Sequence, residues 1–340
     1  MNESNLEKAA GNRKPIIGIT IGDAAGIGPE VVIKALLDKT VNKNFCPVLI
    51  GDASVLFKTA EELNLDLHAI IVKEKDDLPE NVEQTTIYDL NNLKQGFDFG
   101  VESAETGRAS AENITAAVGF WSDGKIDAIA TAPISKNAIR LGGYNFPGHT
   151  EFLAELTGTK DFAMSFFADK LRVVLLSTHI SLTDAIDFVR TENLVRLIRF
   201  SAAELARLLK KEVTLAVAGL NPHASEGGMF GKQEQDEIKP AIEICRRDFG
   251  INVSGAYSPD TIFLRAFRGE FDGVIACYHD QATIAVKCLS FGASVNVTLG
   301  LPLIRTSVDH GTAFDIAGKG IADASSMKSA INLAAKLTSH

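Results

Sequence analysis

This sequence has few cysteines and no long apolar segment. The first feature argues against a protein held together by disulfides, and the second argues against a membrane-spanning protein. The 340 residues contain only four cysteines, and no two of them form a CxxC pair. This usage argues against a disulfide framework and suits a reducing compartment. No apolar run is long enough to span a bilayer, and the polar N-terminus lacks the apolar stretch of a signal peptide. We therefore expect a cytoplasmic protein with no membrane partner.

Positive charge is also scarce. The 34 Lys and Arg residues are outnumbered by 43 Asp and Glu residues, which leaves a net charge of −9 and a pI near 5.4. Such a balance argues against a nucleic-acid surface, although a few local cations are enough to bind an anionic substrate. A chain of 340 residues, 46% of them hydrophobic, usually folds as two domains rather than around one core.

Strand-like and helix-like segments alternate along the chain. An apolar run at residues 15–22 is followed by a glycine-rich turn and by a helix that begins at Pro29, since proline is favoured at the first helical position. The glycine spacing of this turn, residues 22–30, matches neither the dinucleotide fingerprint nor the P-loop, so we interpret it as a tight structural turn. The alternation continues towards the C-terminus and predicts a doubly wound α/β fold.

Three of the seven histidines end short apolar runs that are typical of buried strands. The runs begin at residues 171, 215 and 274, and they end in His179, His223 and His279. In parallel α/β folds, ligands bind beyond the carboxyl ends of the strands. Three imidazoles at that edge would suit a divalent metal with positions left open for substrate. Three unrelated loop histidines are the alternative.

Two polar loops are further candidates. Residues 147–151, Pro-Gly-His-Thr-Glu, precede a helical run, where Thr150 either caps the helix or joins His149 in donating to an anion. Residues 221–228 contain one proline and two glycines directly after a predicted strand, and loops of this kind often carry function. The segment that follows, residues 235–247, has the pattern of an ordinary amphipathic helix.

Three polar residues near the C-terminus fall close to successive element ends: Lys287, Asn296 and Arg305. Lys and Arg together can hold a phosphate or a carboxylate, and surface charges are the alternative. Arg305 follows an apolar run, which argues against free solvation. The loop at residues 309–320 has three glycines that permit close approach of a ligand, such as the adenosine end of a nucleotide, although a plain connecting loop is nearly as well supported.

Long motifs in this chain resemble one family. The similarity runs from about residue 17 to residue 333, in the strings GDAAGIGPEV, TAPISK, FPGHTE, STHISL, LNPHASEGGMFG, SPDT, YHDQ and NVTLGLPLIRTSVDHGTAFDIAGKG. These strings resemble the 4-hydroxythreonine-4-phosphate dehydrogenases of vitamin B6 biosynthesis and their relatives that act on 4-phosphothreonate or 4-phosphoerythronate. The loop at residues 309–320 is also similar to the adenosine-binding loop of isopropylmalate dehydrogenases.

The resemblance implies an α/β fold like that of isocitrate and isopropylmalate dehydrogenases, with two α/β/α domains and a cleft between them. Residues 1–142 with 296–340 would form the first domain, which carries the NAD loop. Residues 143–295 would form the second, which carries the metal and the dimer interface. The resemblance also implies a homodimer with the active site near the interface, NAD or NADP as oxidant, and one divalent ion (Zn, Mg, Co or Mn).

Site residues of the family carry over to matching positions. The implied metal ligands, which the family shares between subunits, are His179, His223 and His279. The implied substrate contacts are His149, Thr150, Lys287, Asn296 and Arg305. The candidate catalytic groups are Asp260 and Lys287. The candidate cofactor-binding residues are His310, Gly311, Thr312 and Asp315.

This sequence also departs from the commonest family pattern. Ala282 and Ala285 stand where many relatives have Gly and Pro, but the spacing from His279 to Lys287 is kept. Ser225 and the string HTEFLAELTG resemble the phosphothreonate branch.

We therefore expect oxidation of the C3 alcohol of 4-phosphooxy-L-threonine by NAD with a divalent metal, followed by decarboxylation to 3-amino-2-oxopropyl phosphate. The same chemistry on 4-phosphothreonate or 4-phosphoerythronate is the first alternative. A metal-dependent lyase or hydrolase without NAD is a more distant one. A two-lobed solute-binding protein is the last alternative, and the missing signal peptide counts against it.

Overall fold

The computed structural model describes residues 13–41, 44–78, 84–94, 96–146, 148–290 and 292–339. The chain divides into two compact units, of which the first ends at Lys160 and resumes at Leu301, while the second spans Asp161–Gly300. Both units mix strands with helices, so the α/β fold class predicted from the sequence is confirmed. Pro147 of the FPGHTE string and the polar N-terminal residues 1–12 lie outside the described residues.

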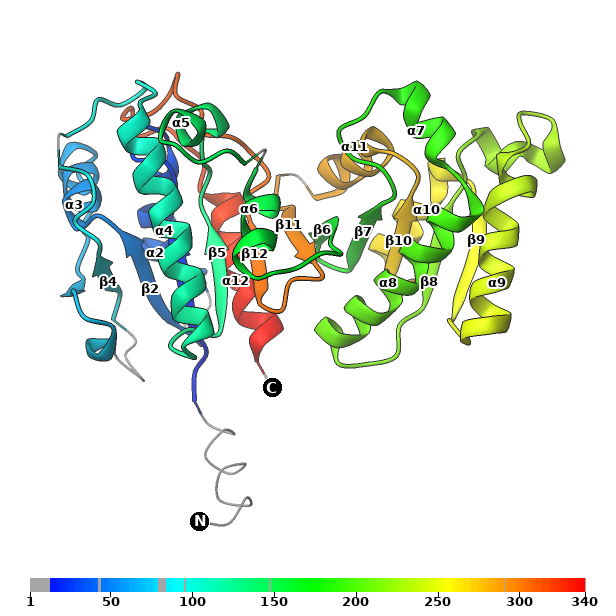
Figure 1. Ribbon diagram of the computed structural model, residues 1–340, viewed down its shortest axis with the longest axis horizontal. Helices are drawn as coiled ribbons and strands as arrows, with labels where there is room; N and C mark the ends of the chain where they lie inside the picture. The colour runs from blue at the N-terminus through cyan, green and yellow to red at the C-terminus, as the bar shows by residue number, and fades with distance from the viewer. Residues whose placement is uncertain are drawn as a thin grey trace, which may run out of the picture. The chain divides into compact units, whose positions relative to one another are not determined.

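The first unit is a parallel sheet with helices on both faces (Figure 1). Its strand order is β3-β4-β2-β1-β5-β12, and every neighbouring pair is parallel. The strands are β1 (Ile16–Thr20), β2 (Cys46–Gly51), β3 (Ile70–Val72), β4 (Thr86–Asp89), β5 (Ala128–Thr131) and β12 (Ile304–Ser307). The helices are α2 (Gly28–Leu37), α3 (Ala53–Glu62), η1 (Lys75–Asp77), α4 (Ala104–Ser122), α5 (Lys136–Leu141), α6 (His149–Leu156) and α12 (Ser325–Thr338).

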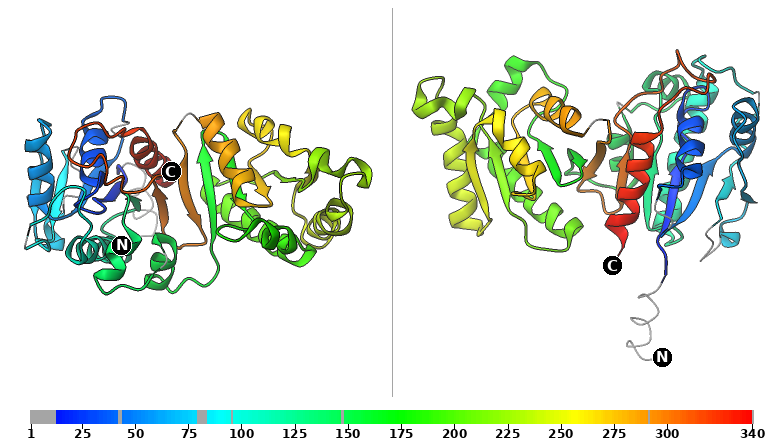
Figure 2. Two further views of the ribbon diagram at one scale, coloured as in Figure 1. Left: turned by 90° about the horizontal axis from the view of Figure 1, so that it is seen from above. Right: turned by 180° about the vertical axis from the view of Figure 1, so that it is seen from behind.

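Side chains of this sheet alternate between two cores because successive residues of a strand point to opposite faces. Ile17 and Ile19 of β1 share one core with residues of α2, α3 and α12. Their neighbour Ile16 belongs to the other core, with residues of α4 and α6. Figures 1 and 2 show α4 on one face of the sheet and α2 with α12 on the other. Helices therefore cover both faces of the sheet, and the ends of the strands are the places where polar groups can gather.

The second unit carries a mixed sheet in the order β11-β6-β7-β10-β8-β9. The pairs β11/β6 and β6/β7 are antiparallel, and the remaining pairs are parallel. The strands are β6 (Ala163–Ala168), β7 (Leu171–Leu175), β8 (Leu215–Ala218), β9 (Val253–Tyr257), β10 (Gly273–Ala276) and β11 (Val295–Leu299). The helices are α7 (Leu182–Phe188), α8 (Thr191–Leu209), η2 (Pro222–Gly228), η3 (Glu234–Ile238), α9 (Lys239–Phe249), α10 (Pro259–Phe267) and α11 (His279–Ser290).

Helices cover both faces of this second sheet as well. Val274 of β10 lies in a core with residues of α10 and α11, such as Ile262. Its neighbour Gly273 faces α8, where an added Cβ would lie 2.6 Å from Cδ1 of Leu205. Neither unit contains, within the described ranges, a helix with the length and apolar content that a membrane crossing requires.

Candidate active site

The three strands that precede the predicted metal ligands are neighbours in the second sheet. β10 pairs in parallel with β7 on one side and with β8 on the other. His179, His279 and His223 follow β7, β10 and β8 respectively, so all three leave the sheet at its carboxyl edge. This arrangement agrees with the placement that the apolar runs predict, and it is the edge where parallel α/β sheets bind ligands.

His179 and His279 lie side by side. Their ring centroids are 5.6 Å apart. Two imidazoles on one tetrahedral zinc, with Zn–N bonds of about 2.0–2.1 Å, would have their centroids about 5.2 Å apart. Nδ1 of His279 lies 2.7 Å from Oδ1 of Asp280, which accepts its proton in the tautomer that leaves Nε2 available to a metal. The pair therefore fits a shared divalent ion.

Within one chain, His223 is not placed to bind a metal ion together with His179 and His279. The described residues contain no group of three His, Cys, Asp or Glu side chains arranged to hold a metal ion. A metal site built from three ligands of a single chain is therefore not found in the described part, and a site with ligands shared between subunits stays a prediction. The His223 ring is exposed and lies 6.4 Å from the ring of Phe230.

An unusual backbone presents His223. Residues 223–227 all have positive φ angles, from 44° to 72°, and four of the five are not glycine. Each non-glycine residue in this left-handed region costs roughly 1–2 kcal/mol, so the turn stores about 4–8 kcal/mol. Other contacts of the fold must hold such a turn in place.

Glu234 makes these contacts, and sequence reasoning missed it. The predicted helix at residues 235–247 proves to be two elements, because η3 is a π-helical turn that precedes α9. The Glu234 side chain is fully buried, and its Oε1 accepts the backbone N–H groups of Leu220 and Asn221 at 2.8 and 2.7 Å. A glutamate at the start of an amphipathic segment normally indicates a solvated face, so no sequence signal identified it.

Gln281 joins the ends of two histidine-bearing strands. Its Oε1 accepts the backbone N–H of Cys277, after β10, at 2.7 Å, and its Nε2 donates to the carbonyl of Gly219, after β8, at 2.8 Å. Burial, and secondly the Glu234 carboxylate, raise the pKa of the Cys277 thiol to about 12, so this thiol stays neutral. Gln281 is part of the YHDQ string, but only the structure reveals this bridging role.

Three further predicted residues of this unit lie on separate elements. Asp260 is near the start of α10, where its Oδ1 accepts from the Ser258 hydroxyl at 2.5 Å. Lys287 is exposed in the last turn of α11. Asn296 lies on β11, and its buried Oδ1 has no hydrogen-bond partner within the described part of the chain. Among the described residues, no hydrogen bond joins these three side chains to the histidines, so their grouping around a substrate stays a prediction.

The first unit contains a buried cation. Arg305 of β12 is 2% exposed, and its Nε and Nη2 both donate to Oγ1 of Thr131, at 3.2 and 2.8 Å. Burial lowers the pKa of its guanidinium to about 9, an effect that the nearby charge of Glu151 partly opposes. The expectation that Arg305 is not freely solvated is confirmed. A buried guanidinium with a lowered pKa is a ready partner for an anion.

His149 and Thr150 begin α6 beside this cation. The N-cap of α6 is Gly148, with no side-chain capping bond, so the interpretation of Thr150 as the helix cap is wrong. Nε2 of the half-buried His149 is itself buried and has no hydrogen-bond partner among the residues that the structure describes. Burial, then the positive charges of Arg305 and Lys136, lower the pKa of His149 well below 6.5, so its ring is neutral. Cations and the positive end of a helix dipole favour a bound anion, and the substrate contacts expected here stay a prediction.

The predicted cofactor loop packs on the glycine-rich turn of residues 22–30. The carbonyl of Thr312 accepts the N–H of Ile27 at 2.9 Å, and a Cβ on Gly26 would lie 2.9 Å from the same carbonyl oxygen. This close approach explains the glycine and supports the interpretation of the turn as structural. His310 has a buried Nε2 without a partner, whereas Gly311 and Asp315 are exposed.

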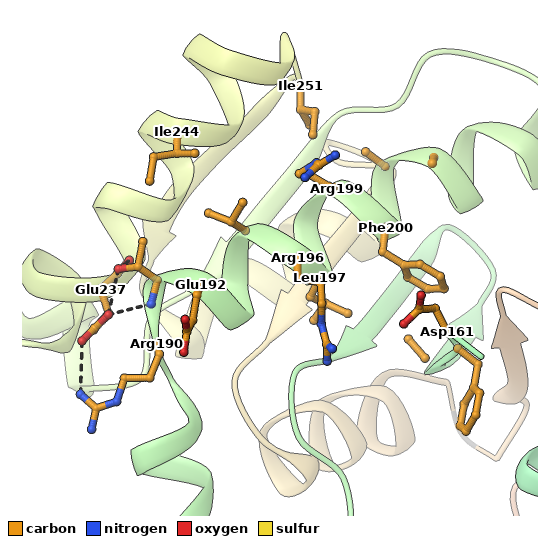
Figure 3. A pocket seen from close by; sticks show the side chains of 16 residues that line it. Asp161, Arg190, Glu192, Arg196, Leu197, Arg199, Phe200, Glu237, Ile244 and Ile251 are labelled. Carbon is orange, nitrogen blue, oxygen red and sulfur yellow. Dashed lines mark hydrogen bonds and ion pairs between the residues drawn. The ribbon is translucent and has the colours of Figure 1, made fainter.

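A cavity of about 1130 Å³ also lies in the second unit (Figure 3). Apolar side chains such as Phe200 and Ile244 line it, and so does Glu237, whose carboxylate accepts the backbone N–H of Thr191 at 2.7 Å and pairs with Arg190. None of the site residues predicted from the sequence lines this cavity.

Known proteins similar to this chain agree with the family suggested by the motifs. Residues 43–334 match the family model described as pyridoxal phosphate biosynthetic protein PdxA. The D-threonate 4-phosphate dehydrogenase of Cupriavidus necator is 45% identical over 324 residues, which cover 95% of this chain and 97% of the relative.

Two solved structures are similar over nearly the whole chain. A 4-hydroxythreonine-4-phosphate dehydrogenase from Klebsiella pneumoniae is 38% identical, with a TM-score of 0.86 over 95% of this chain and 99% of that one. One from Burkholderia phymatum is 42% identical, with a TM-score of 0.84 over 96% and 99%. Since the family model and these relatives cover most of its length, the chain belongs to the PdxA family of pyridoxal phosphate biosynthetic proteins.

Proposed function

We propose that this protein is an NAD-dependent, divalent-metal-dependent dehydrogenase that oxidises the C3 alcohol of a 4-phosphorylated four-carbon hydroxy acid. D-threonate 4-phosphate is the first candidate substrate, because the relative from Cupriavidus necator is named for it. 4-Phosphooxy-L-threonine, the substrate expected from the sequence, is the second, because the two solved structures are named for it. The candidates differ at C2, which bears a hydroxyl in the first and an amine in the second.

The buried guanidinium of Arg305 carries the proposal. Its pKa is lowered because burial removes the water that would otherwise solvate its charge. A phosphate or carboxylate replaces that water with charge-assisted hydrogen bonds, which match the planar fork of arginine. Thr131 accepts from two nitrogens of the fork and so fixes its orientation. A preformed site of this kind favours a substrate with a strongly anionic group.

His149, Thr150 and Lys136 would contact the same anion. The neutral His149 ring supplies a hydrogen bond rather than a charge, since its pKa is held well below the usual range. We further propose that Lys287 and Asn296 are substrate contacts. The buried Oδ1 of Asn296, which lacks a partner, would accept from a substrate hydroxyl or amine.

His179 and His279 would hold the metal together with His223 of a second copy of the chain. Exposed apolar side chains follow or border these histidines in sequence and support a homodimer, because association would bury them. They are Ile180, Leu182, Met229 and Phe230, which are 46–73% exposed. When bound, the divalent ion supplies Lewis acidity toward the C3 oxygen and so lowers the pKa of the alcohol.

Four residues of the C-terminal loop would bind the dinucleotide: His310, Gly311, Thr312 and Asp315. An added Cβ on Gly311 would have no heavy atom within 4 Å, which leaves room for a ligand beside the backbone. The buried Nε2 of His310, without a partner, would gain one from that ligand. When bound, NAD supplies the acceptor for the hydride that leaves C3.

Asp260 and Lys287 are the candidates to accept the hydroxyl proton, directly or through water. Oxidation at C3 gives a β-keto acid. The C1–C2 bond then breaks, carbon dioxide leaves, and the electron pair that stays at C2 takes up a proton. D-threonate 4-phosphate would give dihydroxyacetone phosphate, and 4-phosphooxy-L-threonine would give 3-amino-2-oxopropyl phosphate. Each turnover would reduce one NAD with no net change in protons.

A comparison of substrates tests this proposal. The protein is mixed with NAD or NADP and with one of three substrates: D-threonate 4-phosphate, 4-phosphooxy-L-threonine or 4-phosphoerythronate. Formation of NADH or NADPH and release of carbon dioxide are measured before the metal is removed by a chelator, after its removal, and after metal is added back. We expect metal-dependent reduction of NAD, with the highest kcat/KM for D-threonate 4-phosphate. Substrate consumption without reduction of either dinucleotide would instead indicate a lyase or hydrolase. Binding without turnover would indicate a solute-binding protein.

A further inference from the structure

The strained turn at His223 rests on a single buried carboxylate. Oε1 of Glu234 accepts two consecutive backbone N–H groups, those of Leu220 and Asn221, at 2.8 and 2.7 Å. Its Oε2 accepts from Nδ2 of Asn221 at 2.8 Å. The backbone of residues 220–221 is thereby held immediately before the left-handed residues begin at His223.

Glycines close the loop around this contact. Gly231 has a φ of +141°, and a Cβ there would lie 2.5 Å from Nδ2 of Asn221. A Cβ on Gly219 would lie 2.9 Å from Cα of Ala224 and 3.2 Å from Oε1 of Glu234. The loop thus folds back on itself, with no room for a side chain at Gly219 or Gly231. A shift at Glu234 would therefore be transmitted to the turn rather than absorbed by empty space.

The charge of Glu234 is unusual for a purely structural role. The side chain is fully buried, and within the described ranges its hydrogen-bond partners are N–H donors, with no ion pair recorded. Burial of an unpaired carboxylate is costly, whereas a neutral acceptor would satisfy backbone donors with less desolvation. Both oxygens of this carboxylate accept from residues 220 and 221, which directly precede the left-handed turn that begins at His223.

We propose that Glu234 is a positioning residue for metal binding, which holds the left-handed turn so that the His223 imidazole is presented to a divalent cation. This inference rests on the proposed role of His223 as a metal ligand. Glu234 itself touches neither the metal nor the substrate; it acts through the backbone of Leu220 and Asn221.

Zinc titration of metal-stripped protein, by calorimetry with a competing chelator, tests the inference. Glu234→Gln keeps the size of the side chain, but its amide N–H₂ group would face hydrogen-bond donors of residues 220–221 and could not accept from them. We expect zinc affinity to fall by about 10–100-fold, the usual effect of losing a group that orients a ligand. We also expect activity to return at high zinc, because the imidazole is displaced rather than lost. Stabilisation by inorganic phosphate, which depends on Arg305 in the other unit, should not change.

Glu237→Gln is the matched control. Glu237 lies in the same π-helical turn and also accepts a backbone N–H, that of Thr191, but it faces the start of α8 instead of the histidine turn. This variant should keep wild-type zinc affinity whatever it does to stability. Glu234→Asp, which keeps the carboxylate, should bind zinc more tightly than Glu234→Gln.

Wild-type zinc affinity in Glu234→Gln, or an equal loss in Glu237→Gln, would overturn the inference. His223→Ala separates this failure from failure of the proposed function: if that variant also binds zinc normally, His223 is not a ligand at all. If Glu234→Gln does not fold, Asn221→Ala is measured beside Gln233→Ala, because Nδ2 of Asn221 donates both to Oε2 of Glu234 and to Oε1 of Gln233. A weaker zinc affinity in Asn221→Ala than in Gln233→Ala supports the role of the carboxylate, and equal affinities refute it.

Discussion

Replacement of Arg305 by methionine should weaken substrate binding without weakening the fold. A guanidinium pKa lowered to about 9 corresponds to a cost of about 5 kcal/mol at pH 7, at about 1.36 kcal/mol per pKa unit. Loss of the bonds to Thr131, and of the further contacts that Arg305 makes, offsets at least about 2 kcal/mol of this. We therefore expect Arg305→Met to be up to about 3 kcal/mol more stable than the wild type in anion-free buffer, as in other replacements of buried ions by apolar groups.

Chemical denaturation at several pH values measures this difference. Because the pKa of the folded state lies below that of the unfolded state, the unfolded chain binds more protons between pH 9 and 12.5, and wild-type stability rises with pH across that window. The advantage of Arg305→Met should accordingly shrink above about pH 9. Inorganic phosphate at about 100 times its Kd should stabilise the wild type by about 2.7 kcal/mol and leave the variant unaffected.

Kinetics complete the test. The kcat/KM for a 4-phosphorylated substrate should fall by about 100–1,000-fold in Arg305→Met, which corresponds to roughly 3–4 kcal/mol, and much less for the dephosphorylated analogue. Arg172→Met is the matched control, since Arg172 is another largely buried arginine, in the second unit, whose pKa is lowered by burial. Equal losses for both substrates in Arg305→Met, together with a less stable fold, would show that Arg305 is structural and refute the anion site.

Three further outcomes are expected. Burial raises the pKa of Asp23 to about 6, above its ordinary 3.8. The folded state therefore holds the proton of this carboxyl more tightly than the unfolded state does, and this contribution to the free energy of unfolding is lost as the pH rises from about 4 to 6. Asp23→Asn, measured by urea denaturation, should flatten that slope and be up to about 3 kcal/mol more stable at pH 7.5. Leu182→Glu should convert a dimer to a monomer in sedimentation, and an unchanged dimer would place the interface elsewhere. His179→Ala should reduce the zinc content per subunit towards zero, whereas full occupancy would remove His179 from the ligands.

Much of the fold follows from local patterns in the sequence. Apolar runs alternate with helical segments, and the strands β7, β8 and β10 fall where such runs occur. A proline and two glycines likewise indicate an irregular segment directly after β8, at residues 221–228. These features depend on neighbours along the chain, so a single sequence reveals them.

Local patterns were least informative where a side chain has a role set by distant partners. Thr150 precedes a helical run in sequence, which fits a cap, yet the helix begins at His149 and Gly148 is the cap. Glu234 has the pattern of a solvated face, yet a π-helical turn directs its carboxylate into the fold. Lys136 belongs to the TAPISK string, from which no role was predicted for it. Only the structure shows that its positive charge helps to lower the pKa of His149.

By itself, the sequence determined the α/β class, the family and the position of three histidines at strand ends, because period, turn chemistry and motifs are properties of short segments. Tertiary structure alone decided that His179 and His279 are adjacent while His223 stands apart on a strained turn. It also decided that Arg305 is desolvated against Thr131, 174 positions away in the chain. Desolvation and ligand geometry depend on which distant segments pack together, and no local pattern encodes that packing.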